Sequence, residues 1–315
     1  MRILTGIQPS GIPHIGNYFG AIRQTVEMQN KGENFLFIAD YHALTTYPKA
    51  EDLRSNVMNL ALSWLACGVD PDRTVFFRQS DIPEVCELSW ILSTFSPVGL
   101  MERAHSYKDK VAKGFEANCG LFTYPILMSA DILLYRANLV PVGKDQKQHL
   151  EIARDLALKF NNRFGDILTI PEEVAVVPGI DGQKMSKSYN NTIPIFDKEK
   201  ALRKVIMSVV TDSKGLEEPK DPDTCNVYAL YKLVATPEEL QEMREKMLAG
   251  NYGYGHAKQA LFEKLWAYFE PMRKRREELE NNLDYVRDLL KRNGEKARNE
   301  AAILLDKVRE AVGLR

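Results

Sequence analysis

Two short segments far apart in the chain carry residues suited to nucleotide chemistry. The first covers residues 13–17, Pro-His-Ile-Gly-Asn, and follows a turn rich in glycine and proline at residues 6–11. It lies between a short apolar strand at residues 3–4 and a periodic helix that begins near Asn17. A helix N-terminus offers unpaired backbone N–H donors and the positive end of the helix dipole, and both favour a polyphosphate. The side chains of His14 and Asn17 add further donors there.

The second segment, residues 184–188, reads Lys-Met-Ser-Lys-Ser and follows a glycine-containing turn at residues 178–182. Lys184 and Lys187 are point charges that could neutralise the oxygens of a leaving pyrophosphate without any covalent step. Taken alone, a Lys-x-x-Lys segment is more often a solvated basic turn. The two segments together, in this order, instead predict the two parts of one ATP site.

Positioning these segments requires a scaffold, and the first half of the chain alternates apolar strand candidates with amphipathic helices. Residues 34–39 and 74–77 predict buried strands, whereas residues 50–67 and 84–95 predict helices. That order implies a parallel sheet with crossover helices, and such sheets bind ligands at the carboxyl ends of their strands. A further helix, strand and helix are predicted at residues 122–135, 139–142 and 145–164.

Beyond the second motif the chain changes character, because every periodic segment there has helical spacing. These segments are residues 198–210, 226–234, 237–248, 256–280 and 284–312. Residues 236–239, Thr-Pro-Glu-Glu, form a capping box with proline at the first helical position. We therefore expect a Rossmann-like α/β domain at residues 1–195 and an all-helical domain at residues 196–315, whose last helix is able to pack back on the first domain.

The predicted helix at residues 122–135 carries a carboxylate on a largely apolar face. Tyr124, Met128, Asp131 and Tyr135 have helical spacing, so they share one side of that helix. A buried carboxylate needs a partner because an unpaired buried charge is costly. An arginine or a helix N-terminus within the protein could be that partner. The alternative is a ligand N–H or O–H, with Met128 and Tyr124 packing on an aromatic ring.

Three other stretches are polar where a packed core would not need polar groups. Residues 39–42 and 143–149 each follow a predicted strand, and residues 106–110 form a basic loop. Alone, each is more often a cap or a surface turn. Because the first two follow strands of one predicted sheet, the three stretches can converge on a single crevice.

Composition places the chain among globular proteins with no membrane segment. Its 315 residues suggest about two domains, and 27% of them are charged and 44% hydrophobic. No apolar run is long enough for a bilayer, and the first residues show no signal-peptide pattern, so we expect a cytoplasmic protein. Four widely separated cysteines without a Cys-x-x-Cys pair argue against zinc and suit a reducing compartment: Cys67, Cys86, Cys119 and Cys225.

The net charge of −1 does not by itself indicate a nucleic-acid-binding protein, whose domains are often strongly basic. Positive residues nevertheless cluster at residues 273–276 and 291–298, where glutamates are interspersed. Each cluster is more often a solvated helix face with ion pairs between successive turns. A contact with RNA stays open as the alternative.

Six segments carry a resemblance to a known family: residues 6–11, 14–18, 130–135, 140–149, 184–188 and 208–213. The segments at His14 and Lys184 resemble the HIGH and KMSKS signatures of class I aminoacyl-tRNA synthetases. Together the six segments resemble the bacterial tryptophanyl-tRNA synthetases, and the likeness extends over essentially the whole chain. Tyrosine-specific enzymes are the nearest alternative. They usually present a tyrosine near the position of Leu4, whereas a leucine fits an indole and offers no hydroxyl partner.

The chain departs from the wider pattern of the class at two points. The first motif ends in Asn17 where many members have histidine, although the tryptophan branch commonly carries asparagine. Some members bind an iron–sulfur cluster through clustered cysteines near the C-terminus. Only Cys225 lies in that part of this chain, so we expect no such cluster.

The resemblance implies a two-step reaction. L-tryptophan attacks ATP, which is accompanied by Mg²⁺, to give tryptophanyl-adenylate and pyrophosphate, and the tryptophan then passes to the terminal ribose of tRNA(Trp). It also implies an anticodon-binding role for the helical domain and a homodimer. Two other classes are less well supported. A non-catalytic RNA-binding relative should have lost lysines that are all present, and a nucleotidyltransferase that never meets tRNA does not obviously need the helical domain.

The resemblance also assigns roles to individual residues. The expected catalytic residues are Lys184, Ser186, Lys187, His14 and Asn17. The expected ATP-binding residues are Gln8, Pro9, Ser10, Gly16, Asn17, Lys108, Lys110, Gly143, Asp145, Gln146, Val176, Lys184, Met185, Ser186 and Lys187. The expected tryptophan-binding residues are Leu4, Gln8, His42, Tyr124, Met128, Asp131, Val140, Val142 and Gln146. Among these, Asp131 would accept the indole N–H, while Tyr124 and Gln146 would hold the ammonium end.

Overall fold

The computed structural model describes residues 1–102, 114, 118–142, 146–171 and 192–315. Contacts divide the chain into two compact units, and neither is a single stretch of sequence. The first unit comprises Met1–Gly11, Ala21–Gly179 and Leu279–Arg315. The second comprises Ile12–Gly20 and Ile180–Glu278. The single boundary predicted at residue 195 is thus simpler than this grouping, and as a domain boundary it stays a prediction.

A parallel sheet forms the centre of the first unit. Its strands are β1 (Arg2–Ile7), β2 (Glu33–Ile38) and β3 (Thr74–Arg78), in the order β1-β2-β3. Leu4 pairs with Phe35, and Phe35 pairs with Val75. Their side chains are mostly apolar and buried, as parallel strands covered by helices require. The predicted Rossmann-like parallel sheet is confirmed.

The strand predicted at residues 139–142 is reduced to a bridge beside β1. Leu139 forms a parallel bridge with Ile3, and the Leu4 N–H donates to the Leu139 carbonyl at 3.0 Å. The Leu139 N–H in turn donates to the Arg2 carbonyl at 3.1 Å. This segment therefore lies next to β1, on the side away from β2.

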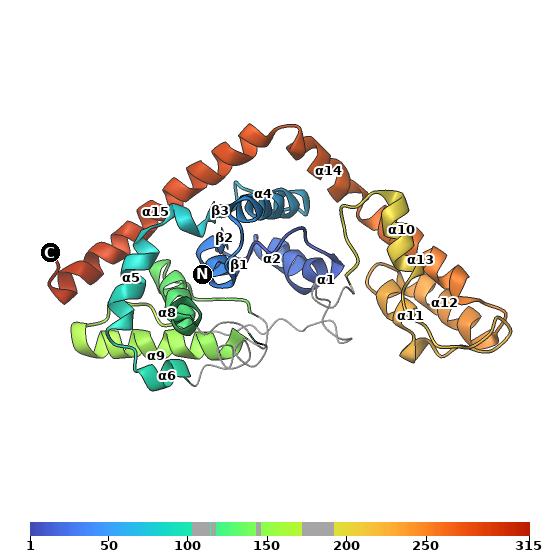
Figure 1. The fold of residues 1–315 in the computed structure, drawn as a ribbon, viewed down its shortest axis with the longest axis horizontal. Helices are drawn as coiled ribbons and strands as arrows, with labels where there is room; N and C mark the ends of the chain where they lie inside the picture. Colours follow the sequence, from blue (N-terminus) through green and yellow to red (C-terminus); the bar gives the residue numbers. More distant parts are fainter. Residues whose placement is uncertain (103–113, 115–117, 143–145, 172–191) are drawn as a thin grey trace. The chain divides into compact units, whose positions relative to one another are not determined.

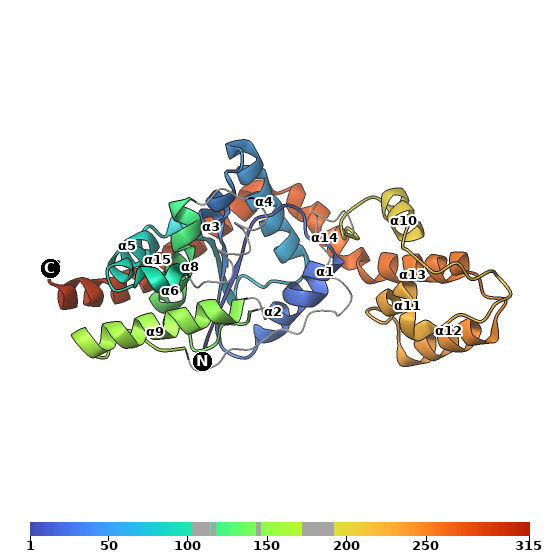
Figure 2. The ribbon, with the colours of Figure 1, turned by 60° about the horizontal axis from the view of Figure 1, so that its bottom comes forward.

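The helices of the first unit include those predicted at residues 50–67, 84–95, 122–135, 145–164 and 284–312. They are α2 (Arg23–Met28), α3 (Asp40–Ala43), α4 (Ala50–Ala66), α5 (Glu84–Ser93), α6 (Val98–Glu102), α8 (Cys119–Leu134), α9 (Lys147–Phe164) and α15 (Leu283–Val312). Short 3₁₀ turns η2 (Leu44–Thr46) and η3 (Gln79–Asp81) follow α3 and β3. Helix α8 packs against both α5 and α9, and the three lie together in both views (Figure 1 and Figure 2).

The long C-terminal helix α15 is part of the first unit, where it contacts β3, α5 and α8 (Figure 1). Its buried face joins the main hydrophobic core through Ala297, Ala301, Leu304, Leu305 and Val308. Ion pairs fix its polar side, because Glu300 accepts from both Arg2 and Arg136. Where α15 passes closest to η3, the helix carries a glycine, Gly294. A Cβ on Gly294 would lie 3.1 Å from the Cβ of Asp81 in η3.

The second unit is mainly helical. Its helices are α1 (Ile15–Asn17), α10 (Glu199–Met207), α11 (Asn226–Tyr231), α12 (Pro237–Ala249), α13 (Tyr254–Tyr268) and α14 (Glu270–Glu280), with a 3₁₀ turn η6 at Pro222–Thr224. Helix α13 contacts both α10 and α11, and Figure 1 shows them gathered with α12. The predicted capping box is present, since Thr236 and Glu239 each accept from the other's backbone N–H.

Two helix predictions in this unit are wrong in detail. The single helix expected over residues 256–280 is interrupted at Phe269, because Pro271 has no N–H for the helical ladder. The helix expected to begin near Asn17 continues as a π turn, η1 (Tyr18–Ile22), before α2. A π turn has more residues per turn, so the neighbouring rings of Tyr18 and Phe19 diverge less, and both are buried.

Those two rings anchor the first motif within its unit. The Tyr18 ring contacts the rings of Tyr268 and Phe269 at centroid distances of 6.0 and 5.0 Å, and its hydroxyl lies 3.3 Å from that of Tyr268. Phe19 contacts the same two rings. Within the described ranges, none of the helices combines the length and the apolar character that crossing a membrane requires.

Candidate active site

The turn after β1 presents polar side chains at the carboxyl end of the sheet. Gln8 and Ser10 are exposed there, whereas Pro9 is buried. The turn is held against β2 because the Ala39 N–H donates to the Ile7 carbonyl at 2.8 Å. Glycine is required just before it, since a Cβ on Gly6 would lie 2.4 Å from the Phe37 ring. This edge is where ligands of parallel α/β sheets bind.

His14 and Asn17 of the first motif hold each other in place. The Asn17 N–H donates to His14 Nδ1 at 3.3 Å, and the His14 N–H donates to Asn17 Oδ1 at 3.0 Å. This reciprocal pair is a capping box at the start of α1. A bridge from His14 to Pro194 and a bond from the Ile15 N–H to the Ile193 carbonyl fix the segment further. Both side chains therefore shape the motif, in addition to any contact with a nucleotide.

Asp131 is the centre of a buried polar network in the first unit. Its side chain is on α8 and the residue is 3% exposed. His42 Nε2 lies 3.0 Å from its Oδ2, and Gln79 Nε2 lies 2.9 Å from both of its oxygens. The protein partners of this carboxylate are therefore a histidine and an amide, rather than the arginine or helix N-terminus that the sequence suggested.

Burial sets the electrostatics of this network. It raises the pKa of the Asp131 carboxyl, while the hydrogen bonds from His42 and Gln79 act in the opposite direction. Burial also raises the pKa of the nearby Asp40 carboxyl, against the bonds it accepts from Ser80. The Ser80 N–H and hydroxyl both donate to Asp40. The strand ends of β2 and β3 are thus joined by hydrogen bonds to acidic side chains.

A second hydrogen-bonded chain runs from Tyr124 to Gln146. The Tyr124 hydroxyl lies 2.8 Å from His149 Nε2, and His149 Nδ1 lies 2.7 Å from Gln146 Oε1. An amide oxygen can only accept, so His149 carries a proton on Nδ1, and in the neutral ring its Nε2 accepts from the tyrosine hydroxyl. The Tyr124 ring also meets the His42 ring edge-on at 6.0 Å. The two hydrogen-bonded networks are therefore in contact. They bring together four of the residues predicted to bind tryptophan: Tyr124, Asp131, His42 and Gln146.

The apolar residues predicted to bind tryptophan are buried or partly buried. Leu4 and Val140 are 1% and 4% exposed and belong to the hydrophobic core, whereas Met128 and Val142 are partly buried beside it. Nine predicted site residues fall outside the described residues: Lys108, Lys110, Gly143, Asp145, Val176, Lys184, Met185, Ser186 and Lys187. Gly16 is half-buried in α1.

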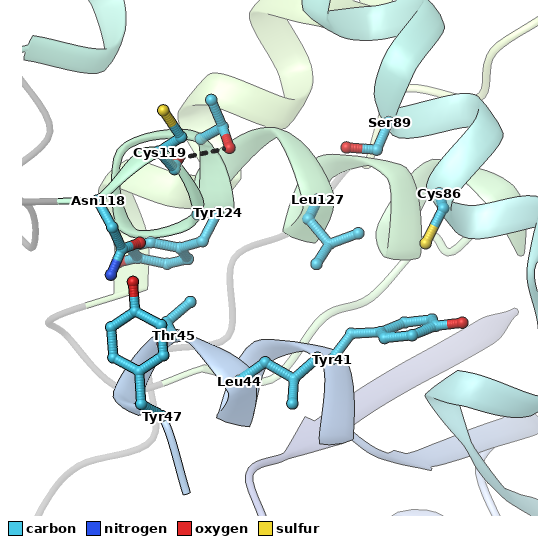
Figure 3. Close-up of a pocket in the computed structure, with 12 residues that line it drawn as sticks. Tyr41, Leu44, Thr45, Tyr47, Cys86, Ser89, Asn118, Cys119, Tyr124 and Leu127 are labelled. Atoms are coloured by element: carbon cyan, nitrogen blue, oxygen red, sulfur yellow. Dashed lines mark hydrogen bonds between the residues drawn. The ribbon is translucent and has the colours of Figure 1, made fainter.

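A surface cavity of about 500 Å³ opens beside Tyr124 (Figure 3). Its wall comes from α3, η2, α5 and α8: Tyr41, Leu44, Thr45, Tyr47, Cys86, Ser89, Asn118, Cys119, Gly120, Thr123, Tyr124 and Leu127. Figure 3 shows Tyr47 and Asn118 at one end, and Tyr41 with Cys86 at the other. None of these lining residues is a lysine, arginine, aspartate or glutamate, so the cavity does not suit a triphosphate.

The basic cluster at residues 273–276 is largely engaged within its own unit. The Arg273 guanidinium stacks 3.5 Å from the Trp266 ring centroid, and Arg276 is 6% exposed with its guanidinium over Phe196. Lys274 and Arg275 pair with glutamates of the same helix. The cluster therefore matches the interpretation of a paired helix face for most of its members.

Sequence reasoning missed Gln79, although the signal was available. Gln79 directly follows β3, and Asp40 is the second residue after β2, so the rule that selected residues 39–42 applies to Gln79 equally. His149 was included in a polar stretch without a role. Gln79 carries no charge and lies in no motif, and His149 stands at the end of the resembling segment 140–149, where nothing in the sequence indicated its partner Tyr124.

Comparison with known proteins establishes the family of the chain. The sequence matches the family described as tRNA synthetases class I (W and Y) over residues 1–270. The chain belongs to this family. The tryptophan–tRNA ligase of Fusobacterium nucleatum subsp. nucleatum is 54% identical over 99% of the chain and 98% of its own length. That of Rhodopirellula baltica is 54% identical over the full length of both.

Solved structures of synthetases share the fold over the whole chain. The tryptophanyl-tRNA synthetase of Campylobacter jejuni, complexed with ADP and tryptophan, matches with a TM-score of 0.92 and 52% identity, covering 99% of this chain and all of that one. The enzyme of Mycoplasma pneumoniae matches with a TM-score of 0.79 and 30% identity, covering 100% and 98%. The resemblance drawn from the motifs is therefore confirmed, and so is the predicted fold class.

Proposed function

We propose that this protein is a tryptophan–tRNA ligase of translation. It activates L-tryptophan with ATP to give tryptophanyl-adenylate and pyrophosphate, and then transfers tryptophan to the 3′ end of tRNA(Trp). The observation that carries the proposal is the full-length likeness to tryptophan–tRNA ligases at more than 50% identity. It is supported by a buried acceptor-only carboxylate beside an aromatic side chain in the catalytic unit.

Asp131 is the residue that selects tryptophan over tyrosine. An indole N–H can only donate, and an ionised carboxylate can only accept. Asp131 receives donors from His42 and Gln79, and a carboxylate has lone pairs for about four. It can therefore accept one more hydrogen bond. The chain of Tyr124, His149 and Gln146 would orient the ammonium end of the same substrate.

ATP activation relies on positioning and on charge. Gln8 and Ser10 lie at the end of β1 and would hold the α-phosphate region, with Pro9 and Gly16 shaping the backbone around the nucleotide. Lys184 and Lys187 would neutralise the departing pyrophosphate, assisted by Lys108 and Lys110. Magnesium enters with ATP as the substrate complex. Among the described residues, no cluster of three or more His, Cys, Asp or Glu side chains could hold a metal ion.

One pair of assays tests the function. Exchange of labelled pyrophosphate into ATP, run with each of the twenty amino acids, should proceed with tryptophan alone. Charging of a tRNA(Trp) transcript should then follow. Equal exchange with tyrosine would reassign the substrate, exchange without charging would indicate a nucleotidyltransferase, and no exchange with any amino acid would indicate a non-catalytic relative.

We also propose that the protein acts in the cytoplasm as a homodimer. Large apolar side chains are exposed around the cavity of Figure 3, including Tyr47 at 68% and Leu44 at 50%. Trp90, next to the lining residue Ser89, is 72% exposed. Large apolar side chains exposed in this way are candidates for a protein interface. Trp90→Glu should shift sedimentation from dimer to monomer, whereas Leu158→Glu, at another exposed apolar residue, should leave the dimer intact.

A further inference from the structure

Gln79 connects three elements of the catalytic unit from a fully buried position. It is the first residue of η3, directly after β3, and is 1% exposed. Its Oε1 accepts from the backbone N–H groups of Tyr41 at 3.1 Å and His42 at 3.4 Å, in the first turn of α3. Its Nε2 lies 2.9 Å from both oxygens of Asp131 on α8. A single amide therefore links the end of β3 to α3 and to α8.

The backbone of α3 determines which way the Gln79 amide faces. A backbone N–H can only donate, so the amide oxygen must point to Tyr41 and His42. The NH₂ group must then point to Asp131. These N–H groups lie within reach of both carboxyl oxygens, and a hydrogen bond to an ionised carboxylate is stronger than one to a neutral carboxyl. The fixed amide thus favours the ionised, acceptor-only form of Asp131.

The same contacts also fix the orientation of the carboxylate. Because one nitrogen lies equally far from both oxygens, turning the carboxyl group about its Cβ–Cγ bond would lengthen a bond to Gln79. His42 Nε2 holds Oδ2 from a second direction. What remains for a ligand is a defined set of unoccupied lone-pair directions on an oriented group, and such preorganisation is the basis of hydrogen-bond selectivity.

We propose that Gln79 is a positioning residue for tryptophan selection, because its amide holds the Asp131 carboxylate as an oriented acceptor for the indole N–H. This inference rests on the proposed function, in which Asp131 contacts the indole. Gln79 itself does not touch the substrate. Its loss should therefore affect the recognition of the N–H more than the rest of the reaction.

Two substitutions of Gln79 test the hydrogen bonds made by its amide oxygen and its amide nitrogen. Gln79→Met keeps the length of the side chain and removes both the donor and the acceptor. Gln79→Glu keeps an oxygen for the N–H groups of α3 and turns a second carboxyl toward Asp131. Gln29→Met is the matched control. Gln29 is also a buried glutamine, which bridges Gly68, Asp70 and Thr74 through both ends of its amide, and it makes no contact with Asp131.

The assay compares tryptophan with β-(3-benzothienyl)alanine, in which sulfur replaces the indole N–H. Pyrophosphate exchange gives kcat/KM for both amino acids with each full-length variant. We expect both Gln79 variants to lower the ratio of tryptophan to analogue about tenfold or more, mainly through a higher KM for tryptophan. Values for the analogue should stay within about threefold of the wild-type protein, and Gln29→Met should preserve the ratio.

A purely structural role gives a different pattern. If tryptophan and the analogue lose activity by the same factor in the folded Gln79 variants, the inference is overturned. If Gln79→Met does not fold, Gln79→Glu decides the question alone, because it retains the bonds to α3. Asp131→Asn distinguishes failure of the proposed function. An unchanged ratio in Asp131→Asn would show that Asp131 does not recognise the indole N–H. A reduced ratio in Asp131→Asn together with a normal ratio in the Gln79 variants would reject only the role of Gln79.

Discussion

Replacing Asp131 by asparagine tests the centre of the proposed pocket with almost no change of shape. In the native structure both carboxylate oxygens face donors, because Gln79 Nε2 lies 2.9 Å from each of them and His42 Nε2 lies 3.0 Å from Oδ2. Whichever way the new amide is turned, its NH₂ group faces the NH₂ group of Gln79. The substitution therefore disturbs the network even before a substrate binds.

The magnitude follows from the bonds that are lost. A hydrogen bond from an indole N–H to a buried carboxylate is charge-assisted, and its loss should cost about 1–3 kcal/mol of transition-state stabilisation. That corresponds to a decrease of about 5- to 150-fold in kcat/KM for tryptophan. The free energy of unfolding should fall by less than is usual when a buried hydrogen-bonded group is replaced. The reason is that the substitution also removes a buried carboxyl group, whose pKa is raised by burial.

The assay is pyrophosphate exchange with tryptophan, run beside urea denaturation of the same preparation. Denaturation separates loss of the pocket from loss of the fold. A folded Asp131→Asn variant with wild-type kcat/KM for tryptophan would refute the reasoning. Asp131 would then be a purely structural residue of α8, held by His42 and Gln79 for packing alone.

Three further predictions address other parts of the molecule. Lys187→Ala should lower the rate of adenylate formation far more than it weakens tryptophan binding, since its charge acts as pyrophosphate leaves; equal losses in pre-steady-state activation and in affinity would instead indicate a folding role. Glu87→Gln should lower the unfolding free energy by about 1 kcal/mol at neutral pH, because Arg309 lowers the pKa of the partly exposed Glu87 carboxyl. This contribution is fully present above the ordinary pKa of glutamate and is lost as the pH falls through the lowered value, so urea titrations should show a smaller difference at about pH 3 than at pH 7. Gly294→Val should destabilise the protein by about 1–3 kcal/mol through overpacking against Asp81, and a thermal midpoint equal to that of the native chain would contradict the close approach.

The elements of the fold were predictable wherever one local pattern dominated. Strands β2 and β3 are apolar runs, and α12 begins at a capping box with proline at its first position, so their ends follow from neighbouring residues. The break at Phe269 was missed because the periodicity of residues 256–280 outweighed Pro271. The π turn at Tyr18 was missed because no local pattern marks it, and its Tyr18 contacts Tyr268, about 250 residues away in the sequence.

The site shows the same division between local and distant information. Asp131 could be selected from its own helix, because a carboxylate on an apolar face demands a partner. The identity of that partner could not, since Gln79 is 52 residues away and carries no charge. Likewise the pairing of Tyr124 with His149 joins two helices, and no spacing in the sequence announces it. Motifs therefore revealed the chemistry, whereas the supporting residues required the tertiary structure.

The C-terminal helix α15 contacts the turn that carries Gln79, although the two lie far apart in the sequence. Asp81 ends η3, the same three-residue turn that begins with Gln79, and it accepts two bonds from Arg78 at the end of β3. Gly294 of α15 lies against this Asp81, so close that a Cβ would require a shift. Helix α15 contacts both β3 and the turn η3. The same turn is bonded through Gln79 to α3 and to Asp131. The orientation of the proposed acceptor, Asp131, thus depends in part on a helix more than 200 residues further along the chain, which the contacts group with the first unit.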